Sequence, residues 1–432
     1  MSALDATQAA LLFVALGLLV VSTVKLVFAP LAIWFEVRQR LTRNGREQLR
    51  IGAHPRRGDD LGGALISVIV PAYNEGVVLA QSVESILRSR YPFLEVIVVD
   101  DGSTDDTATV MADLAARHPR VRAIRQANAG KGAALNRGVA EAKGEVFVFV
   151  DADGLFSGRT LDWMLVSLAA PGVGAVCGDD RPANPDRPLT QLLSVMSHVG
   201  TGLVRRALSL LHCLPIVSGN VGAFRASLIR EIGGFREDTI GEDLELTWRI
   251  YAAGYRVVFQ PRAIVYAESP STIRGLWNQR VRWARGLLQT TRIHRRLIGN
   301  PAHGVFGIFL ALNTFSMIVA PPLQLVVLVG VLVVTMAGEP AIPDTIGILG
   351  WLGILVSAGL VVLAIGLNGA WSELRHLWTL PLWPIYSVAM SFTMVAALAH
   401  EIRGAPARWN KLQRTGVVTD GVLAGIARLD RG

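Results

Sequence analysis

Between Leu65 and about Ala267, short apolar runs alternate with longer stretches of helical character. Short β-branched runs at residues 65–70, 95–99 and 146–150 are typical of strands buried on both faces. Stretches with helical character lie between them at 76–90, 107–117 and 132–142. Strands that alternate with helices predict βαβ units, so we expect an α/β domain with a mainly parallel sheet.

Four long apolar runs lie outside this region, at residues 9–35, 305–337, 346–366 and 377–399. Each reaches the roughly 20 residues that a membrane-spanning helix needs. Only the first run contains a charged residue, Lys25. It lacks a basic segment before it and is longer than the apolar part of a signal peptide, which favours an uncleaved anchor. Overall composition agrees, with 51% hydrophobic and 18% charged residues and a mean hydropathy of +0.41.

Basic residues cluster beside the apolar runs. Seven arginines between Arg38 and Arg57 follow the first run, which places the α/β domain in the cytoplasm. This clustering explains the net charge of +8 without a nucleic-acid partner, since the chain shows no nucleic-acid-binding module. The tail from Arg403 to Arg414 is also basic and should lie inside. Cys177 and Cys213 support neither a disulfide framework nor a zinc site.

The membrane topology has a parity conflict, because three spans after a cytoplasmic domain would put the tail outside. Residues 377–399 contain Pro381 and Pro384 and could be interfacial or re-entrant. Alternatively, the run 305–337, interrupted by Pro321-Pro322, holds an interfacial helix followed by one span. We favour one N-terminal span and two C-terminal spans and leave residues 377–399 open.

Polar residues follow each of the three predicted strands. In parallel sheets, ligands bind beyond the carboxyl ends of the strands, so these segments predict one shared site. Asp151 and Asp153 could hold a divalent cation that also binds phosphate oxygens, or they could cap a helix. Asp101 could accept hydrogen bonds from a nucleotide's base or ribose. Lys131, between two glycines at the start of a helix, suits the polar groups of a nucleotide.

Two further motifs lie closer to the C-terminus. Glu242 and Asp243 begin an amphipathic helix, where a carboxylate can act as a general base or simply favour the helix N-terminus. In Gln279-Arg280-Val281-Arg282-Trp283, Arg282 offers a planar fork for phosphate and Trp283 a flat face for a sugar ring. The alternative for this motif is a membrane-interface belt, which we expect of the neighbouring residues Arg274, Trp277, Arg285 and Arg292. The segment 273–302 is predicted to form an interfacial amphipathic helix.

The ordered motifs resemble those of the processive family 2 glycosyltransferases, membrane enzymes that polymerise sugars from nucleotide donors. The matching segments are Val70-Pro71-Ala72-Tyr73-Asn74-Glu75, Asp100-Asp101-Gly102-Ser103-Thr104-Asp105, Gly130-Lys131-Gly132-Ala133-Ala134-Leu135-Asn136, Asp151-Ala152-Asp153, Gly241-Glu242-Asp243 and Gln279-Arg280-Val281-Arg282-Trp283. Many relatives carry Thr where this chain has Gly241. The resemblance implies an α/β GT-A (Rossmann-like) cytoplasmic domain combined with transmembrane and interfacial helices, and an inverting mechanism.

The same resemblance assigns roles to residues. Asp243 would be the base, with Glu242 beside it, and Asp153 would bind Mg²⁺ or Mn²⁺. The donor-binding residues would be Pro71, Tyr73, Glu75, Asp101, Lys131, Asp151 and Arg282. The acceptor-binding residues would be Gly219, Gln279 and Trp283.

The expected organisation has six parts: an anchor at 1–36, a basic linker at 37–64, the GT-A domain at 65–270, interfacial helices at 271–304, a transmembrane region at 305–400 and a cytoplasmic tail at 401–432. The expected location is the inner or plasma membrane, with several passes. The expected partners are a UDP-sugar donor, a growing polysaccharide, membrane lipids and a small accessory membrane subunit.

The expected function is a processive synthase that extends and exports a β-linked glycan, with UDP-N-acetylglucosamine favoured over UDP-glucose as donor. One alternative is a non-processive transferase that adds a single sugar to a lipid carrier. Another is a receptor or transport component with an inactive nucleotide-binding domain, which the complete set of carboxylates argues against.

Overall fold

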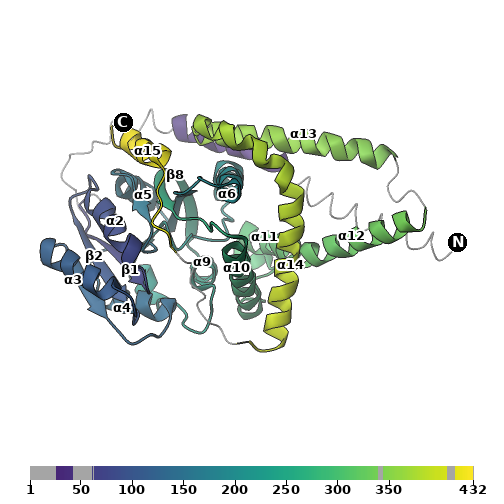
Figure 1. Cartoon of the computed structure of the whole chain (residues 1–432). Coiled ribbons are helices and arrows are strands. Elements are labelled where there is room, and N and C mark those ends of the chain that lie inside the picture. The colour runs from purple at the N-terminus through teal and green to yellow at the C-terminus, as the bar shows by residue number, and fades with distance from the viewer. Residues whose placement is uncertain (1–25, 42–60, 62, 339–343, 406–413, 432) are drawn as a thin grey trace.

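An eight-stranded mixed sheet forms the centre of the structure, a computed structural model that describes residues 26–41, 61, 63–338, 344–405 and 414–431 (Figure 1). The strand order is β3-β2-β1-β4-β7-β6-β8-β5. The strands are β1 Ile66–Ala72, β2 Leu94–Asp100, β3 Val121–Arg125, β4 Val146–Phe149, β5 Leu155–Phe156, β6 Val173–Pro182, β7 Gly222–Arg225 and β8 Arg256–Ala267.

The first half of the sheet follows the predicted βαβ pattern. Strands β1 to β4 pair in parallel, with β1 between β2 and β4. The intervening helices are α2 Gly76–Leu87, α3 Thr107–Arg117 and α4 Lys131–Glu141. All three strands and all three helices predicted here are therefore confirmed, to within a few residues at their ends.

The second half of the sheet is not purely parallel. Strand β7 pairs antiparallel with both β4 and β6, and β5 pairs antiparallel with β8, while β6 and β8 are parallel. The expectation of a mainly parallel sheet is thus correct only for its first half. Strand β5 follows β4 without a helix between them, and the four-residue strand β7 later enters the sheet antiparallel to β4.

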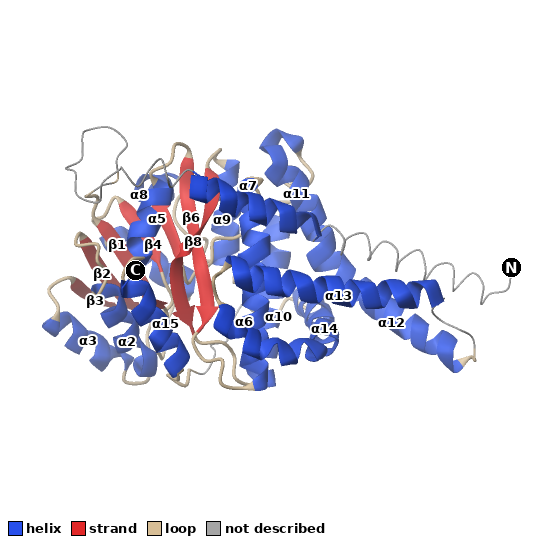
Figure 2. Cartoon of the chain, turned by 90° about the horizontal axis from the view of Figure 1, so that it is seen from above, coloured by secondary structure: helices blue, strands red, loops and turns tan. Residues whose placement is uncertain are grey.

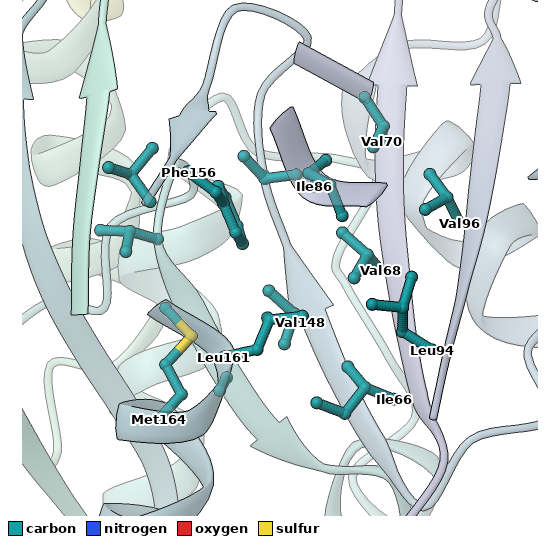
Figure 3. Close-up of a cluster of buried hydrophobic side chains, with 14 of the residues drawn as sticks. Ile66, Val68, Val70, Ile86, Leu94, Val96, Val148, Phe156, Leu161 and Met164 are labelled. Carbon is teal, nitrogen blue, oxygen red and sulfur yellow. The ribbon is translucent and has the colours of Figure 1, made fainter. Parts of the chain in front are cut away.

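Both faces of the sheet are buried, as expected for strands made of continuous β-branched runs. Ile66, Val68 and Val70 of β1 point to one face, where they pack with side chains of α2 and of α5 Thr160–Leu168 (Figure 3). Ile69 points to the opposite face and joins a second core. The two cores fix the sheet between layers of helices, so the carboxyl ends of its strands form a rigid edge.

The α/β domain is joined by a set of apolar helices towards the C-terminus. These are α10 Ile273–Ile293, α11 Gly304–Thr314, α12 Ala320–Met336, α13 Asp344–Leu367, α14 Trp383–Ile402 and α15 Asp420–Arg431. Within the described residues, the helical segments Pro301–Met336 and Trp371–Ile402 are long and apolar enough to cross a membrane. Helices α12 and α13 project beyond the α/β domain, whereas α14 lies beside α10 (Figures 1 and 2).

The first of these apolar segments begins with a helix that docks on the α/β domain. Phe306 of α11 stacks on Tyr251 at 3.8 Å between ring centroids and is buried in the second core. A π-helical turn, Phe315–Val319, then leads into α12 at Pro321-Pro322. The predicted alternative for this run is an interfacial helix followed by one span. The structure shows a docked helix followed by a projecting helix (Figure 1), and their placement in a membrane stays a prediction.

The second apolar segment contacts the α/β domain near its start and helix α10 near its end. The Ser194 hydroxyl donates to Glu373 at 2.6 Å near its start, and Arg285 of α10 pairs with Glu401 at 2.6 Å near its end. Further on, α15 packs against β8 through Val422 and Tyr266. Most of the predicted anchor, most of the basic linker and residues 406–413 of the tail lie outside the described residues.

Candidate active site

The acid turn at residues 241–243 opens helix α9 Glu242–Ala252 and leaves the predicted base, Asp243, partly buried. The Gly219 amide donates to Oδ2 of Asp243 at 3.2 Å, and the Leu244 amide donates to Oδ1 at 2.8 Å. Burial, followed by the neighbouring Glu242 carboxylate, raises the pKa of Asp243 to about 6. A carboxylate with this pKa is ionised at neutral pH yet binds a proton well, as a general base requires.

Lys131 is the cation at the centre of this site. It lies at the first position of α4, and its Nζ pairs with Asp151 at 2.8 Å and with Glu242 at 3.1 Å. Burial alone would lower the pKa of Lys131, but Asp151, Glu242 and Asp243 together raise it, so the side chain stays charged. The structure therefore brings together residues predicted from three separate motifs.

A hollow lies between these groups. One side is lined by Lys131, Gly219, Glu242 and Asp243, and the other by apolar side chains that include Phe235. A site with convergent polar groups on one wall and an apolar wall opposite is the usual setting for a small-molecule ligand. Lys131 and Asp243 thus share one wall of this small hollow.

Asp101 is fully buried and shapes the loop that carries Lys131. Its carboxylate accepts hydrogen bonds from the Ala129 amide at 2.9 Å, the Gly130 amide at 2.8 Å and the Gln126 side chain at 2.8 Å. These contacts order the approach to α4. The contact of Asp101 with a nucleotide stays a prediction.

The loop after β1 is held against the loop after β2. Asn74 adopts a positive φ of 54°, and its side-chain oxygen accepts from the Thr104 amide at 2.7 Å. The following Glu75 amide donates to the Thr107 hydroxyl at 2.7 Å. Pro71 is buried at the end of β1, and Tyr73 is partly exposed just beyond it. The predicted donor-binding loop thus has a defined shape at the sheet edge.

Asp153 has a different environment from Asp243. Arg414 of the C-terminal segment pairs with both of its oxygens at 2.9 Å, and the Glu268 amide donates to Oδ2 at 2.8 Å. Glu268 in turn accepts from the Thr415 hydroxyl at 2.6 Å. Burial raises the pKa of Asp153, whereas Arg414 opposes this rise. The predicted metal ligand is therefore neutralised by an arginine far away in the sequence.

The motif Gln279–Trp283 lies in the first half of α10. Trp283 is 49% exposed, and the guanidinium of Arg280 lies 4.2 Å from the centroid of its ring. Arg282 is partly buried, and within the described part of the chain its Nε has no hydrogen-bond partner. About half of the Trp283 side chain is exposed to a ligand, whereas the unpaired Nε of Arg282 is itself buried, so the predicted roles of Gln279, Arg282 and Trp283 stay predictions.

Arg285 corrects one sequence-based interpretation. We expected it in a membrane-interface belt, but its side chain is buried and pairs with Glu401, while its guanidinium also donates to the Ala405 carbonyl at 2.6 Å. Arg274, Trp277 and Arg292 are exposed on the same helix, as expected for such a belt. The difference arises because Arg285 faces the end of α14, which the local sequence does not reveal.

Four residues at the site were missed by sequence reasoning: Glu268, Gln289, Glu401 and Arg414. Their contacts join segments about 50 to 260 residues apart, so no local motif announces them. From the sequence alone, Arg414 is one of several positive charges in a basic tail. Its only sequence signal is that Thr415 and Gly416 follow it as turn-forming residues after the last apolar run.

Comparisons with known proteins agree with this geometry. Residues 63–286 match the family described as glycosyltransferase like family 2. A poly-beta-1,6-N-acetyl-D-glucosamine synthase of Staphylococcus epidermidis is 32% identical over 222 residues, which cover 51% of this chain and 54% of the relative. The corresponding synthase of Staphylococcus aureus strain COL is 30% identical over 229 residues, covering 53% and 55%. This chain thus aligns with about half the length of these relatives.

A solved structure shares the fold. A mannosyltransferase from Pyrobaculum calidifontis in complex with GDP-Man and Mn²⁺ superposes with a TM-score of 0.60 at 23% identity, covering 89% of this chain and 100% of the other. The α/β domain therefore has the GT-A fold with a mixed sheet. Because the family match covers just over half of the sequence and includes every strand of that sheet, this chain belongs to glycosyltransferase-like family 2.

Proposed function

We propose that this protein is an inverting, processive membrane synthase that transfers a sugar from a nucleoside-diphosphate donor to a growing β-linked glycan. The observation that carries the proposal is the partly buried Asp243, with a pKa of about 6, which lines the same hollow as Lys131 and Gly219. The named activity of the staphylococcal relatives supports UDP-N-acetylglucosamine as the first donor to test and UDP-glucose as the second.

In this mechanism Asp243 removes the proton of the acceptor hydroxyl. The hydroxyl oxygen forms a bond to the anomeric carbon of the donor sugar as the bond from that carbon to the diphosphate breaks. The electron pair of the broken bond leaves with the nucleoside diphosphate. Lys131 lies where it can offset negative charge on that leaving group, and Gly219 orients Asp243 through its amide. Arg282 adds a second cation for the diphosphate, and Trp283 and Gln279 bind the acceptor.

Asp151 and Asp153 would hold the divalent cation. Within the described residues no group of three or more His, Cys, Asp or Glu side chains could hold a metal alone. Two carboxylates nevertheless fit Mg²⁺ or Mn²⁺, because such ions often take one or two protein oxygens and complete their shell with phosphates and water. When bound, the cation supplies neutralisation of the diphosphate charge. The mannosyltransferase with the same fold was solved with Mn²⁺.

We place the protein in the cytoplasmic membrane with its GT-A domain inside. Helices α12 and α13 project away from the domain and serve as the two C-terminal spans (Figure 1). The segment Trp371–Ile402 touches the α/β domain through Glu373 and helix α10 through Glu401, which favours an interfacial position for α14. Two spans return the chain to the catalytic side, where Arg414 meets Asp153. This topology removes the parity conflict.

The direct experiment is to incubate purified protein in detergent or nanodiscs with a panel of nucleotide sugars and Mg²⁺ or Mn²⁺, and to measure nucleoside-diphosphate release. We expect release from UDP-N-acetylglucosamine above all others, and we expect Asp243→Asn to abolish it. A wild-type protein that releases no nucleoside diphosphate from any donor would overturn the proposal.

Product length separates processive synthesis from the alternative reaction. A processive synthase yields long chains at early times, which elute near the void volume in gel filtration. A transferase that adds one sugar to a lipid carrier yields a single small product extracted by organic solvent. The exposed ring of Trp283 supports processive synthesis, because it can hold the sugar ring at the end of a growing chain.

A further inference from the structure

Helix α10 touches the acid turn through its second half, beyond the motif that the sequence singled out. The backbones of Gly241 and Gly286 lie in contact, since a Cβ atom on Gly241 would lie 2.9 Å from the Cα of Gly286. A backbone contact this close leaves no space for a side chain. It also gives a reason why this chain has Gly241 where many relatives carry Thr.

Gln289, one turn further along α10, holds the residues just before the acid turn. Its Oε1 accepts hydrogen bonds from the Ile240 amide and from the Thr239 hydroxyl, both at 3.1 Å. Thr239 is only 8% exposed, and its hydroxyl oxygen accepts from the Gly241 amide at 3.2 Å. Gln289 therefore fixes the two residues from which Gly241, Glu242 and Asp243 follow.

Glu401 at the end of α14 sets the orientation of Gln289. The Nε2 of Gln289 donates to Oε1 of Glu401 at 3.1 Å, and the same oxygen accepts from Nε of Arg285 at 2.6 Å. An amide side chain can be turned over so that its oxygen and nitrogen exchange places. The carboxylate of Glu401 accepts only, so it selects the orientation in which the Gln289 oxygen faces the acid turn.

Tight packing holds α10 and α14 together around this group. Val281 and Ala284 of α10 are buried against Met394 and Ala397 of α14. Arg285 and Glu401 close the end of this contact. A displacement of α14 along α10 would therefore move Gln289 or break its bond to Glu401.

We propose that Gln289 is a positioning residue for the catalytic base, and that Glu401 acts through it to couple the apolar helix α14 to the acid turn. The inference rests on the proposed function, because it concerns the placement of Asp243 as the base. It assigns α14 a part in catalysis in addition to any part in the membrane.

A charge swap between the two positions tests this coupling. Gln289→Glu keeps an acceptor for Thr239 and Ile240 but places a second carboxylate against Glu401. We expect kcat to fall roughly tenfold, the rate equivalent of about 1.4 kcal/mol, with little change in the KM for the donor. Adding Glu401→Gln restores a donor–acceptor pair and keeps one carboxylate near Arg285. We expect the double variant to recover to within about threefold of wild type, as a direct coupling requires.

Three controls make the result specific. Asn278→Asp introduces the same charge at an exposed position of α10 and should leave kcat unchanged. Melting temperatures of all variants show whether the fold is retained. The pH midpoint of kcat should move in Gln289→Glu, which adds a carboxylate beside the acid turn, and should return in the double variant, which has the same net charge as wild type.

The outcomes separate this inference from the proposed function. If the wild type is active, two results would overturn the coupling and leave the proposed function intact. One is a normal kcat in Gln289→Glu, and the other is a double variant that is as slow as Gln289→Glu. A wild type with no transfer from any donor would overturn the proposed function itself. Loss and recovery of kcat at constant KM would establish the coupling.

Discussion

The site contains two aspartates with raised pKa values, the partly buried Asp243 and the buried Asp153, and their surroundings are opposite. Asp243 accepts hydrogen bonds from backbone amides and shares Lys131 with Asp151 and Glu242, so it has no cation of its own. Asp153 is paired with Arg414 through both oxygens. The first arrangement keeps a carboxylate able to take a proton, and the second holds a negative charge for a cation. Under the proposed function, the two roles differ because of the partners of the two carboxylates and not because of residue type.

The largest expected effect concerns Asp243, the first aspartate of this comparison. Asp243→Asn keeps the size of the side chain and removes its basicity, and a positioned general base contributes about 10²–10⁴-fold to a rate. We expect kcat for nucleoside-diphosphate release to fall by that factor while donor affinity, measured by calorimetry, stays nearly unchanged. Normal turnover in this variant would exclude Asp243 as the base.

The second-largest expected effect concerns Asp153, the other aspartate of this comparison. Asp153→Asn removes the charge that we assign to Mg²⁺ or Mn²⁺ binding, and a bound cation supplies several kcal/mol of charge stabilisation. We expect roughly a hundredfold loss of activity at moderate metal concentration and a weakened binding isotherm for Mn²⁺. Unaltered Mn²⁺ binding in Asp153→Asn would show that the metal, if used, is held elsewhere.

A third variant sharpens the comparison by altering the pKa of the base. Glu242→Gln removes the carboxylate that raises the pKa of Asp243 and frees Lys131 to face Asp243, and both changes lower that pKa. The acid limb of the kcat profile should therefore move to lower pH, so that the variant loses less of its activity than wild type does between pH 6 and pH 5. A limb that stays in place or moves to higher pH would contradict the assigned cause.

The smallest effect concerns Arg414. Arg414→Ala leaves Asp153 buried without its cation, so we expect a lower melting temperature in the absence of metal. Mn²⁺ should then raise the melting temperature of this variant more than that of wild type, because the ion replaces the missing charge. The exposed Arg403→Ala serves as the matched control and should behave as wild type. Equal Mn²⁺ responses in all three proteins would argue against a shared place for metal and Arg414.

The two sides of the site also differ in how far the sequence predicts them. Lys131, Asp151, Glu242 and Asp243 each follow or open a regular element, so strand and helix patterns were enough to bring them to one edge of the sheet. The pairing of Asp153 with Arg414 spans 261 positions, and that of Arg285 with Glu401 spans 116. Such contacts depend on the packing of whole helices, which periodicity does not report.

The sheet shows the same division. The first four strands form a local βαβ series with continuous β-branched runs, and they were predictable apart from the short edge strand β3. The order and direction of β5 to β8 depend on which distant strand each one meets, as the antiparallel β7 illustrates. Sequence patterns predicted the elements that carry the chemistry better than the long-range contacts that hold them in place.

The pH dependence of kcat in the wild-type protein tests the central assignment of Asp243 most directly. Asp243 accepts a proton only when it is ionised, so the rate should fall as pH decreases through about 6, which is its raised pKa. Below that midpoint each further pH unit should cost about tenfold in kcat for nucleoside-diphosphate release from UDP-N-acetylglucosamine. A profile that stays flat down to pH 4 in a protein that remains folded would contradict the assignment of Asp243 as the base.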